Sequence, residues 1–402
     1  MILHGKYPIL LALECTLLID YSAYCYRHVR FLPRFLHQDL YEALMKVIHV
    51  VESFAAGVLH FVVQLTHAMP DAEHIVIHGE RPDTPPYYAA LFPAGVTLIP
   101  WQHVTRDIAP VHDSLALYYL MRLLKQQTGD VIHLHSSKAG FLGRLAIGLL
   151  RLPARVIYTP HGAAFLRQDV SPAKQALFIW LEKFGHWCGG QVIACSASEA
   201  AAFQGYGIPA DYINNGVQCT EMPATPQTDT DTHCKVIVAG RISQQKNPAL
   251  FNEIAQAFLD QPRISFIWIG DGELRHLLTA PNIHCTGWVE QSEVTTHLQQ
   301  ATIYLSTSLW EGLPLSALQA MCQGLPLVLS ECTGHVDIVQ NGRNGFLFQG
   351  REAAIAAIQV LVSDKTLLER FGFASWKLLE EQFSIKQMEN SYRWIYIDNG
   401  SF

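Results

Sequence analysis

The sequence predicts an α/β protein of two domains, each built around a parallel β-sheet. Short β-prone runs alternate with helix-patterned segments along most of the chain, and this alternation is typical of parallel sheets whose strands are connected by helices. A polar, aperiodic stretch at residues 218–233 interrupts the alternation near the middle of the chain. A length of 402 residues, half of them hydrophobic, is ample for one domain on each side of this stretch.

The first half of the chain supplies seven candidate strands and at least four helical patterns. The opening strand is the run Lys-Val-Ile-His-Val-Val, which starts directly after Met45. The strands are expected at residues 46–51, 74–78, 97–99, 131–135, 156–159, 191–195 and 211–213, and the helical patterns include residues 58–68, 112–127, 140–151 and 174–187. We therefore expect a first domain over residues 45–217, followed by a linker over residues 218–234.

The second half restarts the same alternation and ends on a helix. Its strands are expected at residues 235–239, 264–269, 283–286, 303–306, 327–329 and 345–348. This gives a second domain over residues 235–380 and a terminal segment over residues 381–402, with a helix at about 385–395. Two α/β domains joined by a linker imply a cleft between them, because ligands of such sheets bind beyond the carboxyl ends of the strands.

Residues 1–44 form an N-terminal extension for which two interpretations stay open. The apolar run at residues 9–24 is interrupted by Glu14 and Asp20 and is short for a membrane span. It lacks the small-residue cleavage site of a signal peptide. The extension is therefore interpreted either as an upstream mis-start, with Met45 as the true first residue, or as an amphipathic membrane-docking segment.

Composition excludes several classes of function. A net charge of −7 and a pI near 6.2 argue against nucleic acid as the main partner. The nine cysteines are scattered without a C-x-x-C pair, so we expect free thiols in a reducing cytosol. His133 and His135 share one face of a strand, but a metal site needs more ligands than this pair supplies. No metal or other cofactor is expected.

Two loops of the second half carry the strongest functional signals. Glu311 lies in a tight strand-to-helix loop before Pro314, where free backbone N–H groups and a positive helix end can hold hydroxyl and phosphate groups. Arg241 and Lys246 place two cations around the loop that follows the first strand of this half. Fixed cations there can stabilise the charge that develops on a diphosphate leaving group without a metal ion.

These segments resemble the nucleotide-sugar site of glycosyltransferase family 4, whose members are retaining enzymes of the GT-B fold. The resemblance implies two Rossmann-like domains facing across a cleft, with the last helix packing back on the first domain. The family carries a Glu, seven residues and a second Glu, and this chain has Glu311 followed by Gln319. A Gln carbonyl can still accept a hydrogen bond from a ribose hydroxyl, but without the strength that a charge adds.

The resemblance also implies the roles of individual residues. Catalytic roles fall on His161, Glu311, Arg241 and Lys246. The implied donor and nucleotide contacts are Gly57, Gly240, Arg241, Lys246, Gly270, Gly272, Val289, Glu311, Gly312, Leu313, Leu315 and Gln319. His135 and Lys138 lie on the acceptor side. No general base is assigned, because the family uses a front-side displacement in which the leaving phosphate helps to take the acceptor's proton.

The expected function is transfer of a sugar, with retention, from a nucleoside diphosphate sugar to a lipid-linked saccharide in capsule, exopolysaccharide or O-antigen synthesis. A UDP-sugar is the favoured donor. The protein is expected in the cytoplasm, in peripheral contact with anionic lipids at the inner face of the plasma membrane, through the basic residues Lys138, Arg144, Arg151 and Arg155. Two alternatives stay open, a pseudo-transferase that binds nucleotide sugar and a nucleotide-sugar 2-epimerase on the same fold.

Overall fold

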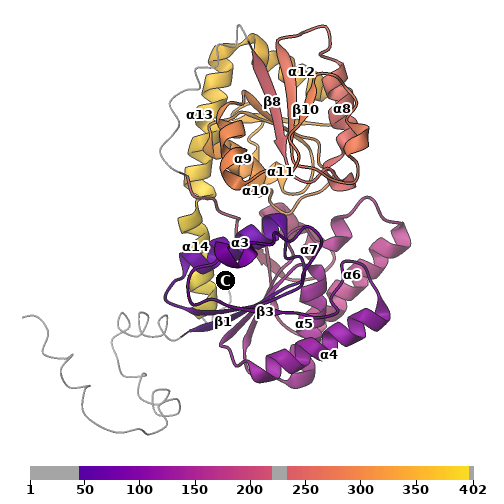
Figure 1. Cartoon of the computed structure of the whole chain (residues 1–402), viewed down its shortest axis with the longest axis vertical. Coiled ribbons are helices and arrows are strands. Elements are labelled where there is room, and N and C mark those ends of the chain that lie inside the picture. The colour runs from indigo at the N-terminus through magenta and orange to yellow at the C-terminus, as the bar shows by residue number, and fades with distance from the viewer. Residues whose placement is uncertain (1–44, 220–232, 398–402) are drawn as a thin grey trace, which may run out of the picture. The chain divides into compact units, whose positions relative to one another are not determined.

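The computed structural model describes residues 45–219 and 233–397, which belong to one compact unit (Figure 1). The expected N-terminal extension and most of the expected linker lie outside the described residues. Within the described residues the prediction of two parallel-sheet α/β domains is confirmed, because both sheets contain parallel strands alone.

Seven strands form the sheet of the first domain, in the order β3-β2-β1-β4-β5-β6-β7. The chain adds strands outward from β1 to β3 and then returns to β4, so β1 and β4 flank the point where the direction of winding reverses. Ligands of doubly wound sheets bind at the carboxyl ends of such strands. The strands are β1 (Lys46–Val51), β2 (Glu73–His78), β3 (Thr97–Pro100), β4 (Val131–His135), β5 (Arg155–Thr159), β6 (Gln191–Ala194) and β7 (Ala210–Tyr212).

Helices cover both faces of this sheet with separate hydrophobic cores. One face packs against α4 (Pro110–Gln126), α5 (Ser137–Leu150), α6 (Pro172–Trp187) and α7 (Ala197–Gly205). The other face packs against α3 (Ala56–Ala68) and the C-terminal helix α14 (Ile385–Ile397). Short 3₁₀ turns at Tyr88–Leu91 and Ala164–Leu166 complete the domain.

The second domain holds a six-stranded sheet in the order β10-β9-β8-β11-β12-β13. Its strands are β8 (Cys234–Ala239), β9 (Ile264–Ile269), β10 (Ile283–Cys285), β11 (Ile303–Ser306), β12 (Leu327–Ser330) and β13 (Gly345–Phe348). Its helices are α8 (Pro248–Gln256), α9 (Gln291–Gln299), α10 (Leu315–Cys322), α11 (His335–Ile338), α12 (Gly350–Ser363) and α13 (Lys365–Gln382), with 3₁₀ turns at Gln244–Lys246 and Arg275–Leu277.

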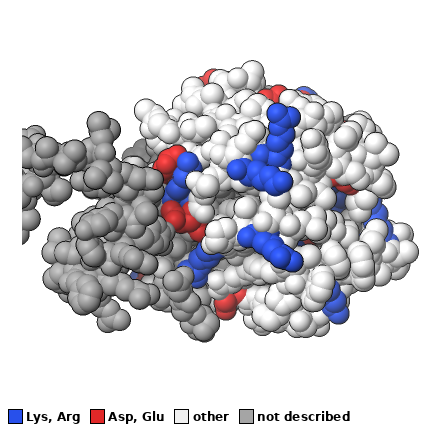
Figure 2. Space-filling model, turned by 90° about the horizontal axis from the view of Figure 1, so that it is seen from below, with Lys and Arg blue, Asp and Glu red and all other residues white. Residues whose placement is uncertain are grey.

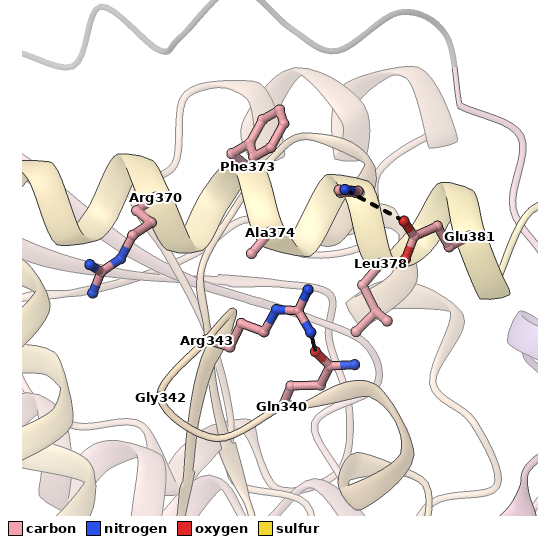
Figure 3. A pocket seen from close by; sticks show the side chains of 9 residues that line it. Gln340, Gly342, Arg343, Arg370, Phe373, Ala374, Leu378 and Glu381 are labelled. Atoms are coloured by element: carbon pink, nitrogen blue, oxygen red, sulfur yellow. Dashed lines mark hydrogen bonds and ion pairs between the residues drawn. The ribbon is translucent and has the colours of Figure 1, made fainter.

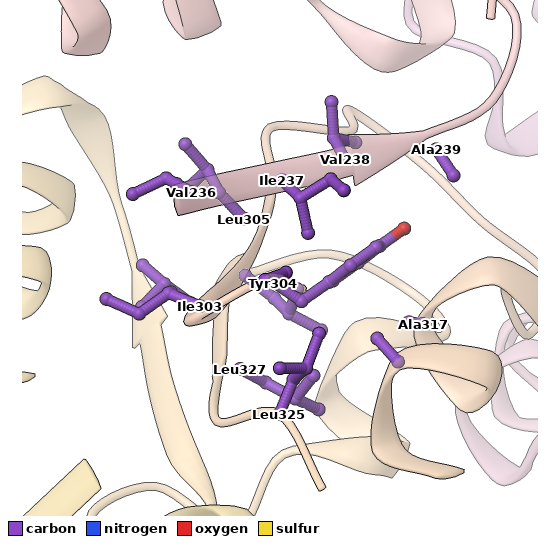
Figure 4. Packing of buried hydrophobic residues seen from close by; sticks show 14 of the residues in the cluster. Val236, Ile237, Val238, Ala239, Ile303, Tyr304, Leu305, Ala317, Leu325 and Leu327 are labelled. Atoms are coloured by element: carbon purple, nitrogen blue, oxygen red, sulfur yellow. The ribbon is translucent and has the colours of Figure 1, made fainter. Parts of the chain in front are cut away.

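The central strands of this sheet are apolar on both faces because helices cover both sides. Val236, Ile237 and Val238 of β8 are almost fully buried, and they pack beside Tyr304 of β11 (Figure 4). The hydroxyl of Tyr304 donates to Ser316 Oγ at 2.8 Å, so it fastens the core to the first turn of α10. The core therefore fixes the place of the loop that joins β11 to α10.

Helix α14 belongs to the last segment of the chain but packs on the first domain, against α3. The Tyr396 hydroxyl lies 2.6 Å from His133 Nδ1 in β4, and Arg393 donates to the carbonyl oxygen of Ala68 at 3.0 Å. These contacts tie the end of the chain to the helix that follows β1.

The cysteines correct one expectation from the sequence. Cys219 and Cys322 are joined by a disulfide, so the prediction of free thiols throughout is wrong for this pair. Their separation of 103 residues hid the pairing from sequence inspection. Cys188, Cys195, Cys234, Cys285 and Cys332 are free thiols.

None of the helices within residues 45–219 and 233–397 is long and apolar enough to cross a bilayer.

Candidate functional site

The donor loop, residues 311–315, leaves the carboxyl end of β11 and runs into α10. Glu311 is buried here, and its Oε1 lies 2.7 Å from the Nζ atom of Lys246, while its Oε2 accepts from Gln245 Nε2 at 3.2 Å. Burial alone would raise the pKa of Glu311, but the charges of Lys246 and His335 and the hydrogen bonds from Lys246 and Ser308 together leave that pKa below its ordinary value. Burial likewise opposes the charge of Lys246, yet Glu311 raises its pKa. The structure thus brings together an ionised pair that the sequence placed on two separate loops.

His335 is a site residue that sequence reasoning missed. It is fully buried in α11, and its Nδ1 lies 2.8 Å from the carbonyl oxygen of Ser330, which leaves Nε2 buried without a partner. Burial lowers the pKa of His335 to about 4, although the nearby Glu311 carboxylate opposes the shift. Its signal in the sequence was a Gly-His pair soon after a strand, because such positions lie at the carboxyl edge of the sheet.

Close approach between backbones explains the glycines that follow β8 and β9. A Cβ atom on Gly270 would lie 2.3 Å from the Gly240 carbonyl oxygen, and one on Gly272 would lie 2.3 Å from the Ile242 carbonyl oxygen. Gly240 and Gly270 also have φ values of +142° and +133°. The two loops therefore pack together only with glycine at these positions. Val289, on the neighbouring loop, packs partly buried against the same core.

Arg241 forms an ion pair with Asp83 of the first domain, which the sequence did not predict. The two side chains are 29% and 24% exposed, so the Arg241 side chain stays partly accessible to a ligand. A diphosphate at this loop would compete with Asp83 for Arg241, because both offer anionic oxygens to the same guanidinium.

Loops from the first domain meet the donor loop. Gly57 lies at the start of α3, and a Cβ atom there would be 4.0 Å from Leu315 Cδ1. Gly162 follows β5, and its Cβ would lie 3.5 Å from the backbone nitrogen of Gly312. The predicted donor residues of both halves are therefore adjacent in the structure.

Two polar side chains of the first domain hold the donor loop by its carbonyl groups. Ser196 Oγ, after β6, donates to the Gly312 carbonyl oxygen at 2.8 Å. Asn215 Nδ2, after β7, donates to the Leu313 carbonyl oxygen at 2.8 Å. Neither residue was predicted, because a lone Ser or Asn at a strand end carries no specific signal in a sequence.

His161 occupies the turn after β5 in a left-handed conformation, with φ of +54°. Its Nε2 lies 3.0 Å from His135 Nδ1, and its Nδ1 lies 3.4 Å from the Sγ atom of Cys195. His135 itself is fully buried and bonded on both ring nitrogens. The structure therefore places His161 in the turn beside the donor loop, with His135 behind it.

Lys138 and Arg144 of α5 have different surroundings from those expected. Lys138 is 11% exposed and pairs with Asp113 Oδ1 at 2.7 Å. The expectation that Arg144 faces a membrane is wrong: its side chain is fully buried and pairs with Glu182 at 2.8 Å. The sequence alone does not distinguish a buried arginine from a surface arginine. The partner that shows Arg144 to be buried, Glu182, lies on the neighbouring helix α6.

Gln319 lies half-buried on α10, about one turn beyond the donor loop. Within residues 45–219 and 233–397, no side chain or backbone group bonds its amide. Its amide is therefore available to a ligand hydroxyl.

Three buried histidines could hold a metal ion by position. One ring nitrogen from each of His49, His133 and His135 lies within 4.8 Å of the others. All three, however, already use both ring nitrogens in hydrogen bonds to Tyr396, Thr159 or other imidazoles. The donor set fits a hydrogen-bonded network at least as well as a metal site.

A shallow pocket of about 310 Å³ lies elsewhere, between the 340–343 turn and α13 (Figure 3). Arg343, Arg370 and Lys377 contribute cations to its lining, and Arg343 donates to Gln340 Oε1 at 2.8 Å. It contains none of the predicted site residues, so we do not connect it with the donor loop.

Comparison with known proteins agrees with this geometry. Residues 55–221 match the family described as Glycosyltransferase Family 4, and residues 233–364 match Glycosyl transferases group 1. The chain is 30% identical over 320 residues to a UDP-Gal:alpha-D-GlcNAc-diphosphoundecaprenol alpha-1,3-galactosyltransferase of Escherichia coli, a match that spans 73% of this chain and 81% of that protein. It is 24% identical over 314 residues to the capsular polysaccharide biosynthesis glycosyltransferase CapM of Staphylococcus aureus, across 69% and 79% of the two chains.

Among solved structures, HepE of Anabaena in complex with UDP-glucose superimposes with a TM-score of 0.69 at 17% identity, over 86% of this chain and 98% of that chain. At this identity the likeness concerns the fold, with its two Rossmann-like domains.

Proposed function

The chain belongs to glycosyltransferase family 4 and has the GT-B fold, and from this premise we propose that it transfers a sugar, with retention, from a UDP-sugar to a lipid-linked saccharide. The product would enter a capsule, exopolysaccharide or O-antigen. The name of the Escherichia coli relative specifies UDP-galactose and a diphosphoundecaprenol-linked acceptor, and the Anabaena protein binds UDP-glucose. These two support the choice of a UDP-sugar donor and a lipid-linked acceptor.

One observation carries the proposal, the ion pair between Lys246 and Glu311, which follow the neighbouring strands β8 and β11. Arg241 lies on the same loop as Lys246. As the bond between the sugar and the phosphate breaks, negative charge develops on the diphosphate. Glu311 holds Lys246 in place before the reaction, so Lys246 stabilises that charge with little reorganisation, and Arg241 would exchange Asp83 for the diphosphate. The ionised Glu311 accepts hydrogen bonds from hydroxyl groups of the transferred sugar.

The proton of the acceptor hydroxyl needs a destination in this reaction. In the proposed front-side displacement, the acceptor oxygen forms its bond to the anomeric carbon on the face from which the diphosphate leaves. The bond from that carbon to the phosphate oxygen breaks, and the same phosphate oxygen takes the acceptor's proton. The chain then needs to supply positioning and charge stabilisation, which matches a site of cations and backbone N–H groups.

A thermal-shift panel tests the donor assignment. We expect UDP and UDP-sugars, without added metal, to raise the melting temperature by mass action, and Arg241→Ala to abolish the shift. Arg351→Ala on α12, with a side chain 43% exposed, is the matched control and should keep the shift. A protein that no nucleotide stabilises would contradict the proposal and favour the pseudo-transferase, for which Gln319 is the supporting observation.

The surface formed by α4, α5 and α6 would contact the membrane that holds the lipid part of the acceptor. These helices contain two acidic residues, Asp113 and Glu182, and both are paired with cations. Exposed basic residues on or next to the helices are Arg122, Lys125, Arg151, Lys174 and Lys183. Figure 2 shows the molecule from below, with several blue side chains on a largely white surface. The surface is thus cationic and suits anionic lipids.

An apolar stripe on α6 accompanies these charges. Leu177, Trp180, Phe184 and Trp187 are spaced three or four residues apart, so they share one helix face. Trp180 is 57% exposed and Trp187 is 80% exposed. Tryptophan is favoured at membrane interfaces, because an apolar ring carries one polar N–H group. We therefore place the membrane contact on α6 instead of at Arg144.

Vesicle flotation tests this surface. We expect the protein to float with vesicles of anionic phospholipid, and the double variant Trp180→Ala/Trp187→Ala to remain in the dense fraction. Phe373→Ala on α13, a residue 50% exposed, removes an aromatic ring elsewhere and should not change flotation. Equal flotation of both variants would contradict the assignment.

A further inference from the structure

A chain of four hydrogen-bonded imidazoles, three of them buried, crosses the first sheet and ends at the proposed glycosyl-transfer site. His74 Nδ1 lies 3.1 Å from His49 Nε2, and His49 Nδ1 lies 3.1 Å from His135 Nε2. His135 Nδ1 lies 3.0 Å from Nε2 of His161. These residues come from the neighbouring strands β2, β1 and β4 and from the turn after β5, and we call them the imidazole chain.

Both ends of the imidazole chain have a defined partner. His74 Nε2 lies 2.9 Å from the carbonyl oxygen of Met69, and His161 Nδ1 lies 3.4 Å from the Sγ atom of Cys195. All four rings are neutral, because burial lowers the pKa of each, in the case of His161 to about 3. Burial also raises the pKa of Cys195 well above its usual range, so the thiol keeps its proton.

The Met69 carbonyl fixes the direction of every bond. A carbonyl oxygen only accepts, so His74 carries its hydrogen on Nε2 and accepts on Nδ1. A neutral ring has one hydrogen, and His49 must therefore donate from Nε2 and accept on Nδ1. The same step makes His135 and then His161 donors at Nε2 and acceptors at Nδ1. Nδ1 of His161 accepts from the S–H group of Cys195. Every ring nitrogen of the imidazole chain therefore has a hydrogen-bond partner.

The turn at His161, where the imidazole chain ends, needs support from its surroundings. His161 has φ of +54°, a left-handed conformation that is unfavourable for a residue with a Cβ atom. The backbone N–H groups of Gly162 and Ala163 both donate to Glu199 Oε1 at 2.8 Å, which holds the far side of the turn. The ring of His161 holds the near side. Strained residues persist where the surroundings fix them from several directions, and such places are often functional.

We propose that the imidazole chain positions the glycosyl-transfer site: it fixes His161 in one tautomer and one orientation, and so holds residues 161–162 against the donor loop at Gly312. His74, His49 and His135 act as positioning residues and touch no substrate. This proposal rests on the proposed function for its kinetic consequence, but the tautomer itself does not depend on activity.

The first experiment measures the tautomer in the full chain labelled with ¹⁵N-histidine, by long-range ¹H–¹⁵N correlation at neutral pH. His161, assigned by the loss of its signal in His161→Asn, should carry hydrogen on Nε2 alone. Hydrogen on Nδ1, or a mixture of the two tautomers, would overturn the proposal. The tautomer of His161 can be measured even if the protein fails to turn over a UDP-sugar. A failure of the proposed function is therefore distinguishable from a failure of the proposal about the imidazole chain.

The second experiment breaks the chain far from the substrate. His49→Phe leaves the Nε2–H of His135 without an acceptor, and we expect kcat/KM for the donor to fall about tenfold or more at a temperature well below melting. His78→Phe is the matched control, because His78 is also fully buried in β2 but neither of its ring nitrogens has a partner. It should change kcat/KM by less than about twofold, the range expected where no buried hydrogen bond is lost.

A conservative variant separates positioning from packing. In His49→Gln the amide can donate to His74 Nδ1 and accept from His135 Nε2, so the direction of the chain survives. It should recover most of the kcat/KM lost in His49→Phe and restore the single His161 tautomer. Equal kinetics of His49→Phe and His78→Phe would overturn the proposal, as would one equivalent of zinc in the purified protein that is lost in His133→Phe.

Discussion

Acidification should unfold this protein through its buried neutral histidines. A histidine whose pKa is lower in the folded state binds a proton more readily when unfolded, so its contribution to stability is complete above about pH 6.5 and is lost as the pH falls toward the folded value. Burial lowers the pKa of several histidines in the described residues, in His161 to about 3 and in His335 to about 4. In the fully buried His49, His133 and His135 it also holds the pKa well below the ordinary value.

The size of the effect follows from these directions. Each pH unit between the two pKa values is worth about 1.4 kcal/mol per group, so at pH 5 a histidine that stays neutral in the folded state costs about 2 kcal/mol. His161 and His335 together then cost about 4 kcal/mol. Because a domain is stable by only about 5–15 kcal/mol, we expect the free energy of unfolding to fall steeply between pH 6.5 and pH 5.

Urea unfolding followed by circular dichroism between pH 7.5 and pH 4.5 measures this slope. We expect the free energy of unfolding to fall with an uptake of about two to five protons. His161→Asn should reduce the uptake by about one proton, whereas His284→Asn, on an exposed position of β10, should leave it unchanged. A free energy of unfolding that is flat from pH 7 to pH 5 would refute the burial of neutral imidazoles on which the reasoning depends.

Three further predictions concern the donor side. Lys246→Met leaves the Glu311 carboxylate buried without its cation, so the free energy of unfolding in urea should fall by about 3–5 kcal/mol. The double variant with Glu311→Gln should recover part of this loss. Strictly additive losses in the two single variants would contradict the pairing. Gln319→Glu should tighten UDP binding by roughly fivefold in calorimetry, because a charged acceptor strengthens the bond to a ribose hydroxyl, and weaker binding would reject the ribose assignment. Gly272→Ala places a Cβ 2.3 Å from the Ile242 carbonyl oxygen and should raise the Kd for UDP and lower the melting temperature, whereas Gly205→Ala, with no atom within 4 Å of the new Cβ, should do neither.

The fold and the donor side could be predicted because their signals are local. Alternation of strands and helices predicts parallel sheets, and the carboxyl ends of adjacent parallel strands meet at one edge. Lys246 and Glu311 follow β8 and β11, which are neighbours in the sheet, so their 2.7 Å contact is a consequence of strand order. A tight loop with Pro at its end marks the donor loop without any knowledge of the partner domain.

The acceptor side was harder to predict because its signals depend on pairing between distant residues. His49, His74 and His135 are unremarkable strand residues until the register aligns them diagonally across three strands: His74 pairs with Val47, two positions before His49, and His135 pairs with Val51, two positions after it. The burial of the Arg144 side chain likewise depends on its ion pair with Glu182 from the next helix. A single sequence carries helix and strand patterns but not the register or the facing of one helix on another.

The two halves of the site hold their geometry by opposite electrostatic means. In the second domain a buried ion pair keeps Lys246 charged beside Glu311, where a diphosphate would gain negative charge. In the first domain the groups behind His161 are neutral imidazoles and a thiol, and a formal charge there would break the direction of the imidazole chain. In the proposed reaction, a cation behind His161 would compete with Lys246 for the leaving phosphate. Neutral hydrogen bonds can hold the turn at His161 firmly and leave the stabilisation of charge to the second domain, where we propose that the nucleotide binds.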